Sequence, residues 1–480
     1  MADESVAEPR AYRWKEISDL PADLEPLRDR ELEALCDVWT EQRRDIGEEQ
    51  TEFSNQLRRQ WAIETGIIEG VYTLDRGVTQ TLIERGIESA RIPHDATNRD
   101  PELVARIIQS HYDVLEGLFA FVKGERPLGT SYIKELHAAL LRYQDTVTAF
   151  DQFGTQFEQR LEKGTYKTLP NNPRRPDGSL HEYCPPEHVA AEMDRLVQLH
   201  QRHVERQVRP QVEAAWLHHT FTQIHPFQDG NGRVARALAS LVFLRGGFFP
   251  LVVSRDDRTA YIDALEKADA GDLPALATLF AQFQKRILTR AISGAIDLRP
   301  AHSLDEAVAQ TRDLLVGVGR IVPAKYNAAK EMVRALFAQT ENRLNGLVAK
   351  LHGEIANANP SFAFSLERIG QPSEGLRSIS EKLHYDPNAN DYHNTIALRL
   401  SAASVVSRIV VSFHGVGPRF RGLLVAAAYL EVGAAAPVPL VEDVFRISYE
   451  EPRAEVEKRY ETWLEDSLIR GLEEWRRTFA

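Results

Sequence analysis

The sequence predicts a mainly α-helical chain that ends in an α+β domain. Up to about residue 293, long stretches carry apolar residues at helical spacing and contain few Gly or Pro breakers. Beyond about residue 304, several strand-like runs lie between helical stretches. The predicted fold class is therefore mainly α, with an all-helical core and a C-terminal α+β domain.

Composition is typical of soluble globular proteins, with 43% hydrophobic and 27% charged residues among 480. At about 150 residues per domain, this length predicts two or three domains. No apolar run reaches the ~18 residues that cross a bilayer, and the polar start carries no secretory signal. Two cysteines, Cys36 and Cys184, suit a reducing cytoplasm. A net charge of −12 argues against a broad nucleic-acid surface. We therefore expect a cytoplasmic protein with no membrane contact.

Helices are expected through most of the N-terminal half. Residues 27–63 are rich in Glu, Arg, Leu and Gln and predict the first helical region. Pro101 begins a second periodic stretch at a place that suits the first turn of a helix. Residues 131–143 form a third amphipathic pattern. Further helices are expected at 186–199, from 212 through 219, and in a run ending near 293.

A long irregular segment interrupts these helices. The stretch "KGTYKTLPNNPRRPDGSLHEYCPPEHV", residues 163–189, is dense in Pro, Asn and Gly. It predicts either a long loop or a short hairpin, and structured loops of this length are usually functional.

The C-terminal region changes character after a candidate linker at residues 297–303. Helices are expected at 304–316 and 324–355, and one charged periodic helix at 453–479. Strand-like runs lie between them, at residues 394–400, 408–413, 423–432 and 444–449.

The segment "HPFQDGNGRVAR", residues 225–236, combines features that a structural element alone does not need. Gly-Asn-Gly before an apolar helix predicts a helix N-terminus, where free N–H groups and the dipole favour anions. Arg233 and Arg236 can bind phosphate oxygens, and Asp229 is a hard ligand suited to Mg²⁺. His225 can act as a general base near neutral pH. Together these residues predict nucleotide-phosphate transfer.

This segment resembles the signature of the Fic family, in the branch that transfers AMP from ATP to protein hydroxyls. The stretches "SYIKELHAALL", "AAWLHHTFTQI" and "RTAYIDALEKADAGDLPAL" extend the resemblance to roughly residues 60–290. It implies an all-helical Fic domain at 59–296 with a β-hairpin flap. Residues 1–58 would form an N-terminal helical region and residues 304–480 a C-terminal α+β domain.

The resemblance implies a role for each signature residue. His225 would deprotonate a Ser, Thr or Tyr hydroxyl that attacks the α-phosphorus of ATP, while Asp229 holds Mg²⁺. Arg233 and Arg236 would hold phosphates, Arg236 the γ-phosphate, and Phe227 would anchor the loop in the core. The remaining signature residues would line the anion hole: Gly230, Asn231 and Gly232.

Two further regions take roles from the resemblance. Tyr261 and Asp269 lie where the family contacts adenosine, although Tyr261 could equally be a packing residue and many relatives have Asn in place of Asp269. The segment at 164–184 resembles the flap that pairs with the target protein, with arms at 164–168 and 180–183. An ordinary surface loop is the alternative for this segment.

The stretch "TGIIEG", residues 65–70, matches the family's inhibitory motif. Thr65 and Glu69 are four residues apart and share one face of a helix. The resemblance implies that this helix, about 59–72, is inhibitory, with Glu69 paired to Arg236 in place of the γ-phosphate. Gly70 would suit closure against the nucleotide site, and Gly66 has no explanation in the sequence.

The leading hypothesis is a self-inhibited protein adenylyltransferase that uses ATP and Mg²⁺ and releases pyrophosphate. Removal of AMP from a modified protein is an alternative within the same site. A nucleotide-binding regulatory module that acts through its C-terminal domain is an alternative of another class. For residues 304–480, target recruitment or self-association into a homo-oligomer is the working hypothesis.

Overall fold

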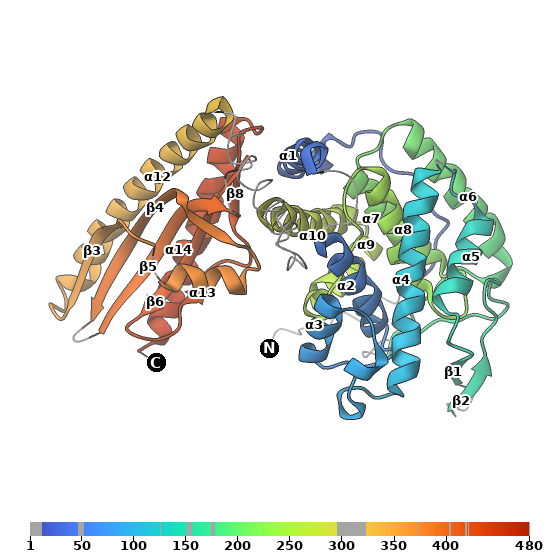
Figure 1. Ribbon diagram of the computed structural model, residues 1–480. Coiled ribbons are helices and arrows are strands. Elements are labelled where there is room, and N and C mark those ends of the chain that lie inside the picture. The colour runs from blue at the N-terminus through green and yellow to red at the C-terminus, as the bar shows by residue number, and fades with distance from the viewer. Residues whose placement is uncertain are drawn as a thin grey trace, which may run out of the picture. The chain divides into compact units, whose positions relative to one another are not determined.

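The computed structural model describes residues 12–46, 52–124, 126–150, 156–173, 178–294, 323–372, 374–402, 405–417, 420 and 422–479. The chain divides into two compact units, Met1–Asp29 with Ser54–Gln284 and Arg30–Phe53 with Lys285–Ala480 (Figure 1). These units divide residues 1–58 between them. The predicted linker at 297–303 and helix at 304–316 lie outside the described residues.

The first unit is built from helices. Pro101 occupies the first turn of its helix, as expected, and the side chain of Asp100 caps that helix by accepting from Leu103 N. The predicted helix at 131–143 ends three residues early, at Leu140. The helices are α2 (Glu52–Ile68), α3 (Arg76–Arg85), α4 (Pro101–Lys123), α5 (Thr130–Leu140), α6 (Pro186–Glu205), α7 (Pro210–Ile224), α8 (Asn231–Arg245), α9 (Arg258–Asp269) and α10 (Leu273–Gly294), the last running into the second unit.

Helices α7 and α8 form the centre of this unit. They pack against each other, with α6 and α9 against α7 and with α4 and α5 against α8. Nearly every residue of both helices is buried, polar ones such as Glu213 and Arg236 included. The loop that joins them, residues 225–230, is therefore held by two elements that cannot easily move.

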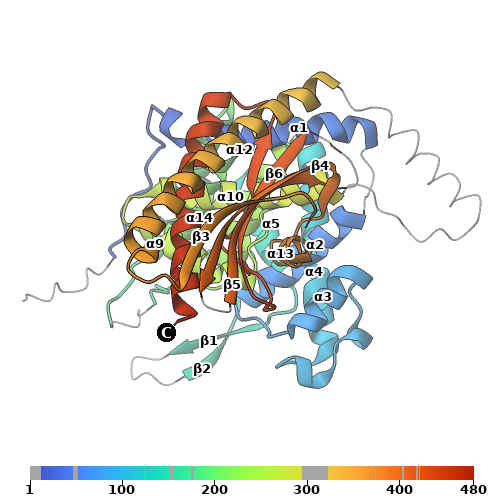
Figure 2. The same ribbon diagram turned by 90° about the vertical axis from the view of Figure 1, so that its left-hand side faces the viewer.

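A two-stranded antiparallel hairpin is present in the first unit, but not where the sequence predicted it. Strands β1 (Thr146–Phe150) and β2 (Gln156–Arg160) pair directly after α5 and extend away from the helices (Figures 1 and 2). Among the described residues of 164–184, neither predicted arm is a strand, and Leu180 makes only an isolated bridge. The Pro residues at 170, 173 and 176 lack the N–H that a ladder needs.

The N-terminal segment from residue 12 to 24 runs over this unit in extended form. Its backbone is tied down at long range, since Ile17 N donates to Glu192 Oε2 over 2.8 Å. Trp216 Nε1 donates to Ser18 O over 3.0 Å. These bonds order a segment for which the sequence carries no regular pattern.

The second unit contains an antiparallel sheet in the order β3-β4-β5-β6-β7, with β8 also paired to β6 (Figure 2). The predicted strands and the final helix are present, and the sequence missed β3, β7 and the short helix α13. The elements are α1 (Arg30–Ile46), α12 (Pro323–Leu351), β3 (Phe362–Ile369), α13 (Glu374–Lys382), β4 (Pro387–Ala402), β5 (Val405–Val416), β6 (Leu423–Val432), β7 (Val438–Pro439), β8 (Phe445–Ser448) and α14 (Arg453–Arg477).

The core of this unit lies between one face of the sheet and helices α12 and α14. Register aligns apolar residues across the strands, with Leu398 opposite Ile409 and Ile409 opposite Leu430. All three are buried, because alternate residues of a strand point to the same face.

No helix among the described residues is long and apolar enough to cross a membrane.

Candidate active site

The loop between α7 and α8 is closed by Asn231. Its Oδ1 accepts from Phe227 N over 2.9 Å, and its Nδ2 donates to Phe227 O over 2.8 Å. Phe227 is fully buried and stacks on His137 at a centroid distance of 3.8 Å. Phe227 is thus the core anchor that the sequence predicted. The side chain of Asn231 therefore holds the loop closed. Its backbone N–H is the group that could contact an anion.

His225 ends α7 in the left-handed region, at φ 48°. Its Nδ1 lies 3.2 Å from Thr222 O, and a carbonyl only accepts, so Nδ1 carries the proton and Nε2 keeps a free lone pair. Burial and the nearby charge of Lys167 lower the pKa of His225 to about 3. A neutral imidazole with an open Nε2 is the form that a general base requires.

Tyr183 covers one face of this imidazole. The two rings stack at a centroid distance of 3.7 Å and an interplanar angle of 9°. Tyr183 belongs to the irregular segment 178–184, whose position is fixed by a bond from Tyr183 N to Asn172 Oδ1. The segment that was predicted to receive a target therefore lies directly against His225.

Arg233 and Asp229 stand at the N-terminus of α8. Arg233 is 1% exposed, and its Nε has no hydrogen-bond partner among the described residues. Its Nη2 donates to Gln144 Oε1 over 2.6 Å, and Gln144 Nε2 donates to Asp229 Oδ2 over 2.5 Å. A buried guanidinium with an unpaired donor, beside the free N–H groups of a helix start, suits an anionic ligand.

Arg236 is held by the end of α2. Its Nη1 donates to Glu69 Oε1 over 2.8 Å, and its Nε donates to Thr65 Oγ1 over 3.1 Å. Nη2 donates to both Thr65 O and Thr65 Oγ1 over 3.0 Å. The structure thus shows the contact between Glu69 and Arg236 that the sequence predicted, with Thr65 as a second partner.

Glycines let these groups approach one another. A Cβ on Gly232 would lie 2.3 Å from Glu69 Oε1, and one on Gly230 would lie 2.5 Å from the Leu141 side chain. Gly230 also has φ 76°, a region that glycine enters without strain. Gly70 has φ 65° and open space around it, so it ends the helix and does not close against another group.

Residues 127–243, which carry most of this site, match the Fic/DOC family. This segment is a Fic/DOC domain.

Curated relatives share parts of the domain. Protein adenylyltransferase Fic of Aedes aegypti is 36% identical over 75 residues, which are 16% of this chain and 15% of that protein. Protein adenylyltransferase fic-1 of Caenorhabditis elegans is 32% identical over 107 residues, or 22% of this chain and 21% of that protein. A Fido domain-containing protein of Dictyostelium discoideum is 52% identical over 61 residues, or 12% and 42%. Each match thus spans less than half of the relative's length.

Among solved structures, a Fic domain containing signaling protein from Bacteroides thetaiotaomicron has a TM-score of 0.44 and 23% identity. That alignment covers 54% of this chain and 94% of the other. A Fic family protein from Desulfovibrio desulfuricans has a TM-score of 0.44 and 16% identity, with 62% and 86% covered.

Helix α2 is docked on the Fic/DOC domain by bonds on several of its residues. Trp61 Nε1 donates to Ser240 Oγ over 3.1 Å, and that hydroxyl donates to Arg236 O over 2.7 Å. Glu64, 5% exposed, accepts from Arg255 N over 2.9 Å. These contacts fix the helix that carries Thr65 and precedes Glu69.

Gly66 finds its explanation in the same helix. A Cβ there would lie 2.6 Å from the ring of Tyr72, which is fully buried. The Tyr72 hydroxyl donates to Ile63 O over 2.8 Å, so the chain after α2 folds back onto the helix. Because glycine has no Cβ, position 66 leaves room for this ring.

The structure places Tyr261 and Asp269 in different surroundings. Tyr261 is 3% exposed, and its hydroxyl lies 2.7 Å from His218 Nε2. Burial raises the pKa of Tyr261, and the charge of the neighbouring Arg236 acts to lower it, so Tyr261 lies beside the arginine that Glu69 contacts. Asp269 Oδ1 lies 3.0 Å from His219 Nε2, and its other oxygen lies 3.9 Å from His181 Nδ1. Asp269 therefore belongs to a cluster of polar side chains on α7, α9 and the irregular segment.

Sequence reasoning missed three residues that touch the site: Gln144, Lys167 and Tyr183. Gln144 lies between regular elements and outside the signature, so neither periodicity nor the resemblance marked it. Lys167 and Tyr183 fall in the two arms of the predicted flap, but the resemblance gave neither residue a role at His225. Lys167 N donates to Pro226 O over 2.8 Å, and burial lowers the pKa of Lys167 to about 8. Tyr183 lies in the predicted flap, but nothing in the sequence around it indicated a ring stacked on His225.

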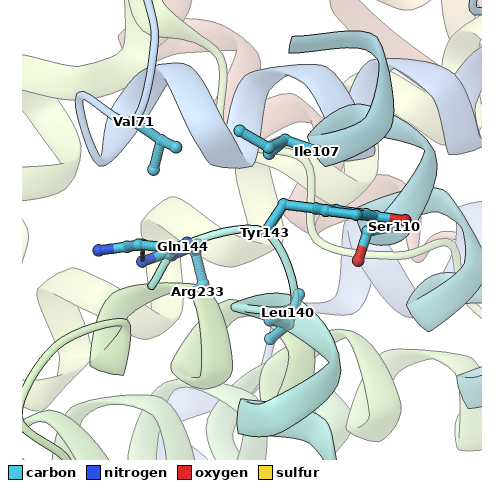
Figure 3. A pocket seen from close by; sticks show the side chains of 7 residues that line it. All are labelled: Val71, Ile107, Ser110, Leu140, Tyr143, Gln144 and Arg233. Carbon is cyan, nitrogen blue, oxygen red and sulfur yellow. Dashed lines mark hydrogen bonds between the residues drawn. The ribbon is translucent and has the colours of Figure 1, made fainter. Parts of the chain in front are cut away.

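A small pocket opens beside Arg233 (Figure 3). Arg233 and Gln144 lie next to each other in it, and α4 contributes Ile107 and Ser110 to its lining while α5 contributes Leu140. The lining residues are Val71, Ile107, Ser110, Leu140, Tyr143, Gln144 and Arg233.

The residues present fit a phosphate ligand and its cation. Arg233 offers an unpaired buried donor, and Gly232 leaves the helix start without a side chain. Mg²⁺ is usually held by one or two carboxylates together with substrate phosphates, and Asp229, whose side chain is 33% exposed, supplies one carboxylate. Within the described ranges, no group of three or more His, Cys, Asp or Glu side chains is arranged to hold a metal by itself.

Proposed function

We propose that this protein is a self-inhibited protein adenylyltransferase. It would move AMP from ATP to a Ser, Thr or Tyr hydroxyl of a target protein and release pyrophosphate. The observation that carries this proposal is the buried Arg233, whose Nε is unpaired at the start of α8 beside the carboxylate of Asp229. Curated relatives named as protein adenylyltransferases support the same activity.

The transfer step follows from the chemistry of His225. Its free Nε2 accepts the proton of the target hydroxyl as the oxygen forms a bond to the α-phosphorus. The bond between that phosphorus and the bridging oxygen to the β-phosphorus breaks, and pyrophosphate leaves. Mg²⁺, held at Asp229, would neutralise phosphate charge. Arg233 and the first N–H groups of α8 bind and orient the phosphates, so the chain contributes position and electrostatic stabilisation.

The target is proposed to bind along residues 164–184. Tyr183, stacked on His225 at 3.7 Å, supports this position because a hydroxyl presented there would arrive beside the base. Backbone pairing with a target would give register without a demand on target sequence.

Self-inhibition is proposed to come from Glu69. Its carboxylate accepts a hydrogen bond from Arg236, the residue proposed to bind the γ-phosphate. Because Gly232 has no side chain, this carboxylate can lie against the start of α8. A γ-phosphate would meet the negative charge of Glu69 in that place. ATP could then bind only with its α-phosphorus turned away from His225.

The first prediction tests the transfer and its inhibition together. The Glu69→Gly variant should incorporate label from α-labelled ATP into protein at least about tenfold faster than wild type, a change of about 1.4 kcal/mol in barrier. Label from γ-labelled ATP should not appear on protein. Incorporation is measured by autoradiography, with targets from a cell lysate identified by mass spectrometry.

Controls separate the alternatives. Adding His225→Ala to Glu69→Gly should abolish the α-label while leaving nucleotide binding intact. Transfer of γ-label would indicate phosphorylation instead. If wild type removes AMP from the modified target faster than Glu69→Gly does, the reverse reaction is the dominant one. Binding of ATP with no label on protein in any variant would leave only a nucleotide-binding module.

A further inference from the structure

Gln144 lies between the two charged groups at the start of α8. Its Nε2 donates to Asp229 Oδ2 over 2.5 Å, and its Oε1 accepts from Arg233 Nη2 over 2.6 Å. Because a carboxylate only accepts and a guanidinium only donates, the amide has one orientation that satisfies both. Its position is fixed by a turn, in which Gln144 N donates to Leu141 O over 3.0 Å.

Asp229 and Arg233 are themselves a near pair. Arg233 Nη2 lies 3.7 Å from Asp229 Oδ2, too far for a hydrogen bond but within the range of an ion pair. Asp229 lies in the loop just before α8, and Arg233 lies in the first turn of that helix. Without an intervening group, Arg233 could turn its guanidinium, whose Nε is unpaired, onto the carboxylate.

We propose that Gln144 is a positioning residue that keeps Asp229 and Arg233 from neutralising each other. Its amide is hydrogen-bonded to one carboxylate oxygen of Asp229 and to one guanidinium nitrogen of Arg233. The other carboxylate oxygen stays available to a cation, and the other guanidinium nitrogens stay available to a phosphate. This inference rests on the proposed function, because it concerns the same nucleotide and cation site.

Asp229 and Arg233 can bind either each other or the cation and the phosphate of a nucleotide. A direct charge-assisted pair between Asp229 and Arg233 would have to break before a cation or a phosphate could bind. Gln144 is neutral, so its bonds satisfy both groups without cancelling their charges. Its loss should therefore raise the Mg²⁺ concentration that nucleotide binding requires, and excess Mg²⁺ should restore that binding.

The test uses the full chain with Glu69→Gly, so that the nucleotide site is accessible. Gln144→Leu is compared with its parent and with Gln201→Leu. Gln201 is an exposed residue of α6 whose amide donates to Glu205 over 3.2 Å. Gln201→Leu therefore removes the same kind of hydrogen bond at a place outside the site. Binding of α,β-methylene ATP, which cannot transfer AMP, is measured by calorimetry across a Mg²⁺ titration.

Gln144→Leu should raise the Mg²⁺ midpoint by about tenfold, which is the scale of one charged hydrogen bond. Affinity at saturating Mg²⁺ should return to within about twofold of the parent value, and Gln201→Leu should shift nothing. An unchanged midpoint overturns the proposal. A loss of affinity that saturating Mg²⁺ does not restore, accompanied by a lower melting temperature, also overturns the proposal, because that pattern indicates structural damage.

The outcome is separable from the proposed function. A shifted midpoint with no α-label on protein in any assay would sustain the role of Gln144 and refute adenylyl transfer. Failure of the Glu69→Gly protein to bind the nucleotide at any Mg²⁺ concentration would refute both.

Discussion

Gly66 and Gly232 occupy places where another side chain fills the volume of a Cβ. The ring of Tyr72 lies against Gly66, and the carboxylate of Glu69 lies against Gly232. The helix-propensity cost of glycine, about 1 kcal/mol, is accepted at both positions because larger residues would push these partners away. The result is that α2 and the start of α8 can meet at Arg236.

Replacing Gly66 tests this close packing. Gly66→Ala should lower the free energy of unfolding by about 1–3 kcal/mol, because the new methyl would lie 2.6 Å from the buried Tyr72 ring. Gly117→Ala is the matched control, since Gly117 lies in α4 with open space around it, and it should stabilise by about 0.5–1 kcal/mol. Urea unfolding measures both. Equal effects of the two substitutions would contradict the packing argument.

At the scale of elements, the geometry of the loop between α7 and α8 depends on the packing of these two buried helices and on the side-chain amide of Asn231. Helix α7 stops at His225 because that residue enters the left-handed region, and α8 starts at Asn231 after Gly230. Asn231 bonds both backbone groups of Phe227, so the loop has a single closed geometry. Side chains on this loop are positioned by the packing of α7 on α8.

Changing the amide of Asn231 should disturb this loop. Asn231→Asp keeps the acceptor for Phe227 N but places an oxygen against Phe227 O, so we expect a loss of about 1–3 kcal/mol in stability. Transfer of α-label in the Glu69→Gly protein should fall as well, because His225 lies on the same loop. Asn357→Asp, at an exposed position, is the control. Full stability and labelling in Asn231→Asp would show that another contact closes the loop.

At the scale of the whole molecule, neutral buried histidines determine how stability responds to acid. Among the described residues, burial is the main cause that lowers the pKa of six histidines, and four of the six lie in the first unit. Burial acts in the same direction on His203, but hydrogen bonds and charges from Glu213 and Asp19 raise its pKa. The six are His111, His137, His218, His225, His393 and His414.

The sign of the pH effect follows from where the protons bind. Between the ordinary pKa of about 6.5 and the lowered folded value, the unfolded chain binds protons that the folded chain does not. Stability should therefore be complete above pH 6.5 and fall as the pH drops, by up to about 1.4 kcal/mol per pH unit for each such histidine. Calorimetry between pH 7.5 and 5 should show the first unit losing thermal stability more steeply than the second. A flat profile over this range would contradict the pKa directions.

The sequence by itself determined the helical class of the first unit and most strands of the second, and residues 225–236 predicted a nucleotide-phosphate site. Those features depend on local periodicity and on neighbouring residue types, which are written along the chain. Only the tertiary structure decided the place of the hairpin, the reason for Gly66 and the positions of Gln144 beside Asp229 and of Tyr183 against His225. Each of these depends on residues distant in sequence, such as Gln144 and Asp229, that meet because α7 and α8 pack together. The contact of Glu69 with Arg236 belongs to both, since the pattern predicted it and the docking of α2 provides it.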